Sequence, residues 1–195
     1  MGGHSSIQKE GEGSGVGCTK FGECIGQSWL TKAYSNCNID CVENENNFVF
    51  LKSTNRKLVS GVKWQCVEYA RRWLIDNKNV TFADVKYAYY IWDLKNGERV
   101  DTRQQVPLLQ FENKISKMLP QIGDLLIYSI DFAVTGHVAV VVSVNSNSIT
   151  IAEQNYFNEL WDGANYSRRL LLEKDEESRY RIFDDELIGW VRFVL

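Results

Sequence analysis

A change of pattern near Gly123 restricts the fold of this chain more than any other feature of its sequence. Before that point, apolar residues recur at helical spacing, as Val67, Ala70 and Leu74 do. After it, short stretches rich in β-branched and aromatic residues alternate with turn residues, which is typical of strands. Helices followed by strands indicate an α+β fold, in which N-terminal helices pack on a mostly antiparallel β-sheet.

The individual elements follow from the same periodicity. We expect one helix over residues 63–77 and a second over residues 83–95, where Asn96 and Gly97 supply a stop. Over residues 18–60 the periodicity is weak, and we expect loops with short helical or extended pieces. Strands are expected at residues 125–129, 137–145, 149–154, 167–173, 180–183 and 188–193.

The length of 195 residues is enough for one domain with a sizeable core. Residues 1–17 are rich in glycine and polar residues, so we expect a flexible tail and then a folded domain over residues 18–195. Gly2 and Ser6 match the N-myristoylation pattern, although an ordinary tail could show the same residues. No apolar segment follows Met1 and no apolar run could span a bilayer, which favours a cytoplasmic protein. Attachment to a membrane is expected only if Gly2 carries the lipid.

Charge and cysteine content exclude further classes. The net charge is −3 without a basic stripe, which argues against a nucleic-acid partner. The chain has five cysteines, and Cys66 stands apart from the others. The spacing of those others lacks a Cys-x-x-Cys pair and favours free thiols, with a zinc site or disulfides as alternatives: Cys18, Cys24, Cys37 and Cys41. We therefore expect no metal.

Cys66 lies in the first turn of the first expected helix. A helix N-terminus stabilises an anion, so it lowers the pKa of a thiol placed there and favours a nucleophilic thiolate. The backbone N–H of Cys66 and the side chain of Gln65 are candidate donors to the oxyanion that forms when a carbonyl is attacked. The alternative is a buried structural cysteine, which is common in helices.

His137 is the only histidine outside the tail, and it opens an apolar strand directly after Gly136. A ring held at the mouth of a rigid strand is well placed as a general base, although a satisfied core histidine would show the same pattern. If residues 145–148 form a hairpin turn, the next strand brings Glu153 near His137. Glu153 is the first candidate to orient the imidazole and Asn155 the second, with a surface glutamate as the alternative.

The residues in these positions resemble the CHAP family, the cysteine, histidine-dependent amidohydrolases and peptidases. The resemblance lies in GVKWQCVEYARRWL at 61–74, TGHVA at 135–139, IAEQN at 151–155 and IGW at 188–190. Within the family, these blocks are similar to the amidase domains of glutathionylspermidine synthetase/amidase and trypanothione synthetase.

The resemblance implies a papain-like α+β fold and a site that needs no metal or cofactor. It implies Cys66 as nucleophile, His137 as general base and acid, and Glu153 as the orienting acid, with the Cys66 N–H and Gln65 at the oxyanion. The implied substrate is a small thiol–polyamine conjugate, cleaved at the amide between the glycine of glutathione and an amine of spermidine. Arg71 falls on a position that would contact substrate, with an ordinary helix-surface arginine as the alternative.

Other functions stay open on the sequence alone. A peptidoglycan-cleaving CHAP endopeptidase or amidase would use the same residues. A non-catalytic module that binds such conjugates, or a scaffold tethered to a membrane through Gly2, would not use them. Because the ATP-grasp synthetase segment of the bifunctional relatives is absent from these 195 residues, we expect hydrolysis rather than synthesis of the amide.

Overall fold

The computed structural model describes residues 20–36, 48–53 and 56–195. Strands dominate this part of the chain, with one α-helix and one 3₁₀ helix among them. In chain order the elements are β1 (Cys24–Ser28), β2 (Thr31–Tyr34), β3 (Phe48–Ser53), β4 (Arg56–Val62), α1 (Cys66–Lys78), β5 (Val80–Phe82), η2 (Ala88–Asp93), β6 (Asn96–Arg99), β7 (Gln105–Glu112), β8 (Leu125–Tyr128), β9 (His137–Val144), β10 (Ser148–Ala152), β11 (Arg168–Lys174), β12 (Tyr180–Phe183) and β13 (Leu187–Phe193).

One large sheet organises the molecule. It holds nine strands in the order β12-β11-β10-β9-β8-β13-β7-β6-β5, and its pairs are antiparallel. Strand β9 lies near the middle, where Tyr128 of β8 pairs with His137 and Ala152 of β10 pairs with Val140. Strand β8 therefore pairs with His137 directly, and β10 holds β9 from Val140 onward.

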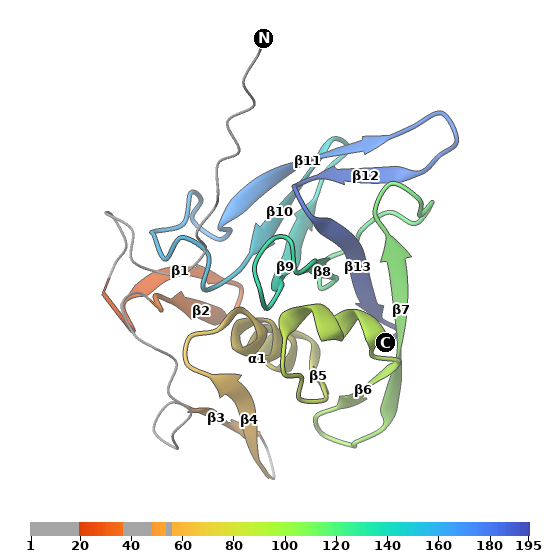
Figure 1. Cartoon of the computed structure of the whole chain (residues 1–195). Helices are drawn as coiled ribbons and strands as arrows, with labels where there is room; N and C mark the ends of the chain where they lie inside the picture. The colour runs from red at the N-terminus through yellow and green to blue at the C-terminus, as the bar shows by residue number, and fades with distance from the viewer. Residues whose placement is uncertain (1–19, 37–47, 54–55) are drawn as a thin grey trace.

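The sheet curls so that its edge strand β12 contacts the segment that follows β7 (Figure 1). The Lys114 N–H donates to the Tyr180 carbonyl at 3.0 Å, and the Tyr180 N–H donates to the Ser116 carbonyl at 2.8 Å. The Asn113 side chain donates to and accepts from the backbone of Ile182 at 3.0 and 2.9 Å. These bonds satisfy backbone groups that an open sheet edge would leave unpaired.

The two faces of the sheet carry separate hydrophobic cores. One face packs against α1, with Val138, Val140 and Leu125 among its buried side chains. The other face is enclosed by the curl and includes Ala139, Trp190 and further aliphatic residues. Burial on both faces explains why β8 to β10 read as nearly continuous apolar runs rather than as alternating strands.

Helix α1 crosses one face of the sheet (Figure 1). Its inward side is formed by Tyr69, Ala70, Trp73 and Leu74, which are at most 1 % exposed. The helix ends at Asn79, whose left-handed backbone (φ 55°) lets its N–H donate to the Leu74 carbonyl. The helix expected over residues 63–77 is thus confirmed, with its start at Cys66.

Two hairpins, β1–β2 and β3–β4, lie beside α1 (Figure 1). A buried charge network ties the first of them to the helix. The Glu68 carboxylate, fully buried, accepts from Arg72 Nε at 2.6 Å, and Arg72 Nη1 donates to the Lys32 carbonyl at 2.6 Å. Ser60 of β4 donates to the same carboxylate at 2.8 Å, so both hairpins are anchored at the first turn of α1.

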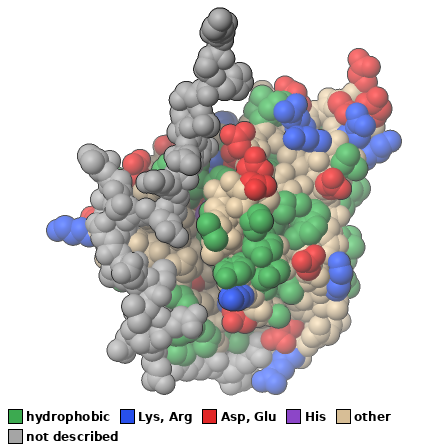
Figure 2. Space-filling model, viewed as in Figure 1, with side chains coloured by type: hydrophobic (Ala, Val, Ile, Leu, Met, Phe, Trp, Pro, Cys, Tyr) green, Lys and Arg blue, Asp and Glu red, His purple; other side chains and the backbone are tan. Residues whose placement is uncertain are grey.

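The predicted fold class, papain-like α+β with N-terminal helices on the sheet, is wrong. In the described part of the chain, strands replace the loops expected over 18–60, and the helix expected over 83–95 shrinks to η2. The apolar spacing at 83–95 buries only Ala88 and Ile91 within η2, while Tyr89 and Tyr90 pack against each other and stack on Tyr87. Figure 2 shows a hydrophobic patch on the face where η2 lies in Figure 1. The architecture is mainly β, with one α-helix against the large sheet.

Two expectations concern residues that the structure does not describe. The flexible tail over residues 1–17, including the lipidation candidate Gly2, lies outside the described residues, as do Cys18, Cys37 and Cys41. Within the described residues, no helix is long and apolar enough to cross a membrane.

Candidate active site

Cys66 is the first residue of α1 and keeps 7 % of its surface exposed. Its sulfur lies against the first free N–H groups of the helix and accepts a hydrogen bond from the Val67 N–H. A second backbone N–H, that of Val138 in β9, also donates to it, and the His137 ring completes the set. The helix N-terminus and the central strand therefore both direct donors at this sulfur.

His137 opens β9 and is 3 % exposed. Its Nε2 lies 2.8 Å from Oε2 of Glu153, so the ring nitrogen left for the hydrogen bond to Cys66 is Nδ1. Two aromatic rings border the imidazole, Phe132 with its ring centroid 5.5 Å away and Tyr156 with its ring centroid 5.6 Å away, and these two rings lie 5.6 Å from each other. These contacts limit the rotation of the imidazole beside the carboxylate.

A glycine makes the approach to His137 possible. Gly136 has φ +65°, a left-handed conformation, and a Cβ there would lie 2.7 Å from the Tyr128 carbonyl oxygen. The segment is also fixed from η2, where the Ala88 N–H donates to the Thr135 carbonyl at 2.9 Å. The turn into β9 thus needs a residue without a side chain directly before the imidazole.

Glu153 follows β10 and is 2 % exposed. Besides His137, its carboxylate accepts from Arg168 Nε at 2.6 Å and Nη2 at 3.2 Å, and from the Ser167 hydroxyl at 3.0 Å. These donors come from the start of β9, from Arg168 at the start of β11 and from Ser167 directly before it. The carboxylate is therefore buried but fully hydrogen-bonded, as a buried charge must be.

The charges of these groups shift one another's pKa values. Burial raises the pKa of Glu153, but Arg168 and His137 outweigh it and lower the pKa to about 2. Burial lowers the pKa of His137, but Cys66 and Glu153 outweigh it and raise the pKa to about 9. Burial raises the pKa of Cys66, but His137 and the two backbone N–H groups bring it below its ordinary value. The site therefore favours a thiolate beside an imidazolium, which is the reactive form of a cysteine nucleophile.

Gln65 occupies the N-cap position of α1, next to the thiol. Its side-chain oxygen accepts from Asn155 Nδ2 at 2.8 Å, and its backbone carbonyl accepts from Gln154 Nε2 at 3.3 Å. Asn155, the second candidate for orienting the imidazole, is thus placed against Gln65, while Glu153 is placed against the ring. Of the three residues that follow β10, Glu153 thus contacts the imidazole, while Gln154 and Asn155 contact Gln65 beside the thiol.

Arg71 lies five residues beyond Cys66 in α1 and is 4 % exposed. Its guanidinium donates to the Ser60 carbonyl at 2.7 Å and to the Ala83 carbonyl and Asp84 carboxylate, each at 3.2 Å. These contacts fasten α1 to β4 and to the segment after β5. The proposal of a substrate contact has no support in them, and the arginine is not on the helix surface either.

Sequence reasoning did not identify Arg168 or Gln154 as part of the site. Gln154 is fully buried and bonds to Glu68 and to the backbone of Tyr34 and Gln65. The only available signal for the arginine was a charged pair, Arg168 with its neighbour, at the start of an expected strand. Alternation then puts one of the two on the inner face, but the pattern does not name its partner.

Of the four cysteines outside the site, Cys24 belongs to the described residues. Cys24 is an exposed free thiol at the start of β1. Among the residues that the structure describes, no group of three or more His, Cys, Asp or Glu side chains is placed to hold a metal ion.

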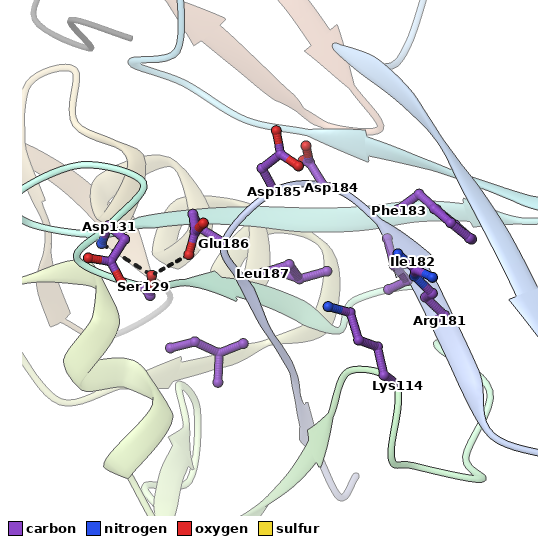
Figure 3. Close-up of a pocket in the computed structure, with 11 residues that line it drawn as sticks. Lys114, Ser129, Asp131, Arg181, Ile182, Phe183, Asp184, Asp185, Glu186 and Leu187 are labelled. Atoms are coloured by element: carbon purple, nitrogen blue, oxygen red, sulfur yellow. Dashed lines mark hydrogen bonds between the residues drawn. The ribbon is translucent and has the colours of Figure 1, made fainter. Parts of the chain in front are cut away.

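A cavity of about 620 Å³ has Asp184 in its lining (Figure 3). It is lined by the turn between β12 and β13, by the residues after β8 and by Lys114. Neither Cys66 nor His137 lines it, so the cavity is not the opening to the thiol. The Asp184 carboxylate in the cavity lining accepts from Arg168 Nη1 at 2.9 Å. This ion pair connects the lining of the cavity to the arginine that contacts Glu153.

Comparison with known proteins places these residues in one matched segment. The CHAP domain profile matches residues 57–155, which contain the thiol, the imidazole and the carboxylate. Trypanothione synthetase of Crithidia fasciculata is 34 % identical over 186 residues, which are 91 % of this chain and 27 % of that protein. The bifunctional glutathionylspermidine synthetase/amidase of Escherichia coli (strain K12) is 36 % identical over 159 residues, 78 % of this chain and 25 % of that protein. The chain spans about a quarter of the length of these curated relatives. With half of its residues in the matched segment, the chain belongs to the CHAP domain family.

Proposed function

We propose that this protein is a cysteine amidohydrolase that cleaves the amide between the glycyl carboxyl of glutathione and a polyamine such as spermidine. The observation that carries the proposal is the continuous chain from the Cys66 thiol through His137 to Glu153 at the start of α1. Membership of the CHAP domain family supports an amidohydrolase-type reaction. The names of two relatives support the conjugate as the substrate class.

The first half of the reaction uses the thiolate. Cys66 attacks the glycyl carbonyl carbon and forms a C–S bond, while the carbonyl electrons move onto oxygen. His137, protonated through Nδ1 by the thiol, donates that proton to the leaving amine nitrogen as the C–N bond breaks. Glu153 stabilises the imidazolium in the meantime, because its carboxylate accepts from Nε2 at 2.8 Å.

The second half regenerates the thiol. Water attacks the thioester, His137 takes a proton from that water, and the C–S bond breaks to release glutathione. The same ring thus acts as acid and then as base, and its contact with Glu153 stabilises the imidazolium that forms in each half. No other reactant is needed for the atoms to balance.

The negative oxygen needs donors near the thiol. We propose the Cys66 N–H for one of them, since it is one of the first N–H groups of α1, which point out of the helix end. The second is the Gln65 side chain, whose oxygen is held by Asn155 at 2.8 Å. This bond directs the amide nitrogen of Gln65 away from Asn155. Donors fixed before the reaction stabilise the oxyanion without reorganisation.

The domain that we propose comprises residues 18–195, with residues 1–17 as a tail. Strand β13 lies beyond the matched segment, yet it pairs with β8, whose Tyr128 pairs with His137. The C-terminal strands are therefore part of the structure that positions the site.

The test is hydrolysis of glutathionylspermidine, followed by the release of free spermidine and glutathione. We expect turnover by the wild type and none by Cys66→Ala, whereas Cys24→Ala, which removes an exposed thiol on β1, should retain full activity. Muropeptides serve as the competing substrate. Hydrolysis of muropeptides but not of the conjugate would overturn the substrate, and equal activity of Cys66→Ala and wild type would overturn the mechanism.

A further inference from the structure

We propose that Arg168 is a positioning residue that keeps Glu153 ionised and aimed at His137. The reactive site is then a chain of four side chains rather than three, with Cys66 at one end and Arg168 at the other. The catalytic meaning of this chain rests on the proposed function, but the arrangement itself rests on contacts within the protein.

The geometry of the grip is bidentate. Arg168 Nε donates to one oxygen of Glu153 at 2.6 Å, and Nη2 donates to the other at 3.2 Å. A planar guanidinium that contacts both oxygens fixes the plane of the carboxylate as well as its position. The oxygen that faces His137 at 2.8 Å is the one contacted by Nη2, so rotation of the carboxylate away from the ring would break both contacts.

Arg168 is itself held from three sides. Its Nη1 donates to Asp184 at 2.9 Å, its Nη2 lies 3.4 Å from the Tyr128 hydroxyl, and its guanidinium carbon lies 4.2 Å from the centre of the Tyr156 ring. Tyr128 in turn donates to Asp184 at 2.8 Å. An arginine with so many fixed partners has little freedom left to lose when it holds Glu153, which makes it a rigid support.

The position of Arg168 follows from the sheet. Arg168 of β11 pairs with Ile151 of β10, and Glu153 follows Ile151 by two residues, so the side chains of Ile151 and Glu153 lie on the same face. Diagonal neighbours on one face of a sheet are within reach of long side chains. The next residue, Arg169, points to the other face, where its guanidinium lies 5.6 Å from the Tyr166 ring, and it provides a matched control.

Charge explains why the support matters. A buried carboxylate without a cation is driven towards its neutral form, which accepts less strongly from an imidazolium. Among the influences on Glu153, the charge of Arg168 is the largest that opposes burial. The other titratable groups that face this part of the site are Cys66 and Tyr69 from α1, Tyr128 from β8, His137 from β9, Tyr156 from the segment after β10, and Asp184 and Asp185 from the segment after β12.

The test measures the pH dependence of Cys66 alkylation by iodoacetamide in the full chain, followed on the Cys66 peptide by mass spectrometry. In Arg168→Met, Glu153 takes up a proton within the acidic range, so the acid limb of the rate should move up by about one pH unit or more. Arg168→Lys, which keeps the charge but not the bidentate grip, should recover part of that shift, and Arg169→Met should show none. A residue with only a structural role would lower stability and leave the midpoint unchanged.

The outcome is decided even if one variant or the proposed function fails. An acid limb of Arg168→Met that coincides with that of the wild type overturns the proposal. If Arg168→Met does not fold, Glu153→Gln is compared with Glu153→Gln/Arg168→Met, in which both members of the ion pair are removed. The two profiles should coincide, because Arg168 acts through Glu153, and a further shift in the double variant overturns the proposal. If the wild type does not hydrolyse glutathionylspermidine, the proposed function fails while the alkylation results still decide the role of Arg168.

Discussion

Replacing the carboxylate of Glu153 by an amide tests the electrostatics of the site most directly. Glu153→Gln preserves shape but removes the charge that faces His137 Nε2 at 2.8 Å and Arg168 Nε at 2.6 Å. Removing an anion beside the imidazolium lowers the pKa of His137 from about 9 towards the ordinary 6.5. A less stable imidazolium supports the thiolate less, so the acid limb of Cys66 reactivity, on which the thiolate forms, should move up in pH.

The magnitude follows from the same two values. The interval from 6.5 to about 9 corresponds to about 3 kcal/mol of preference for the protonated ring. Cys66 contributes more to this preference than Glu153, so the carboxylate accounts for a fraction of it. A loss of about 1 kcal/mol, less than half of that preference, lowers the rate at neutral pH by about fivefold.

The assay is the rate of Cys66 alkylation by iodoacetamide between about pH 5 and about pH 11, where only the thiolate reacts. Glu173→Gln is the control, because that residue lies exposed on β11. Its profile should coincide with that of the wild type. The reasoning is refuted if Glu153→Gln, verified as folded, shows the same midpoint of the acid limb and the same rate at neutral pH as the wild type.

The remaining predictions concern the thiol, the turn into β9 and the stability of the fold. Cys66→Ala should abolish hydrolysis while its unfolding free energy in urea changes by about 1 kcal/mol or less; measurable turnover would contradict the role of the thiol. Gly136→Ala should destabilise the protein by about 1–3 kcal/mol, because φ is +65° and the new Cβ would meet the Tyr128 carbonyl at 2.7 Å. It should also slow alkylation of Cys66, and an unchanged unfolding free energy would show that the turn relaxes. The folded pKa of Glu153, about 2, is below its ordinary 4.5, so its contribution to stability is present above pH 4.5 and is lost as the pH falls towards about 2. The stability difference between wild type and Glu153→Gln should therefore narrow over that interval in urea titrations, and a constant difference would contradict the lowered pKa.

Helix α1 and the strands from β8 onward could be predicted because their own residues determine them. In α1 the residues Tyr69, Ala70, Trp73 and Leu74 supply a continuous buried side, and tertiary packing agrees with the local spacing. The strands that the sequence analysis missed have weaker local signals. Strand β7 alternates buried Val106 and Leu108 with exposed residues, but the proline between them argues against a strand.

The error over residues 83–95 has a different cause. Apolar and aromatic residues at helical spacing predicted a helix, yet η2 covers only Ala88–Asp93. Its tyrosines find partners in one another, with Tyr89 and Tyr90 ring centroids 4.4 Å apart, rather than in the core. Periodicity reports which residues are apolar, but not whether a core is available on that side, and this error led to the incorrect fold class.

The pairing of Glu153 with His137 depended on a detail that no sequence pattern contains. At the turn end of the β9–β10 hairpin, Ile149 pairs with Val144 and Thr150 with Ser143, but Ile151 pairs with Val141. The irregularity inserts one extra residue in β9, and an insertion of one residue exchanges the two faces of a strand. With the register of the turn end, Glu153 would lie opposite Val140 and share the face that packs against α1. With the bulge, Glu153 lies opposite Ala139, on the face of β9 that also carries the His137 side chain. The sequence argument found the correct neighbour along the hairpin, and the bulge turned the carboxylate towards the ring.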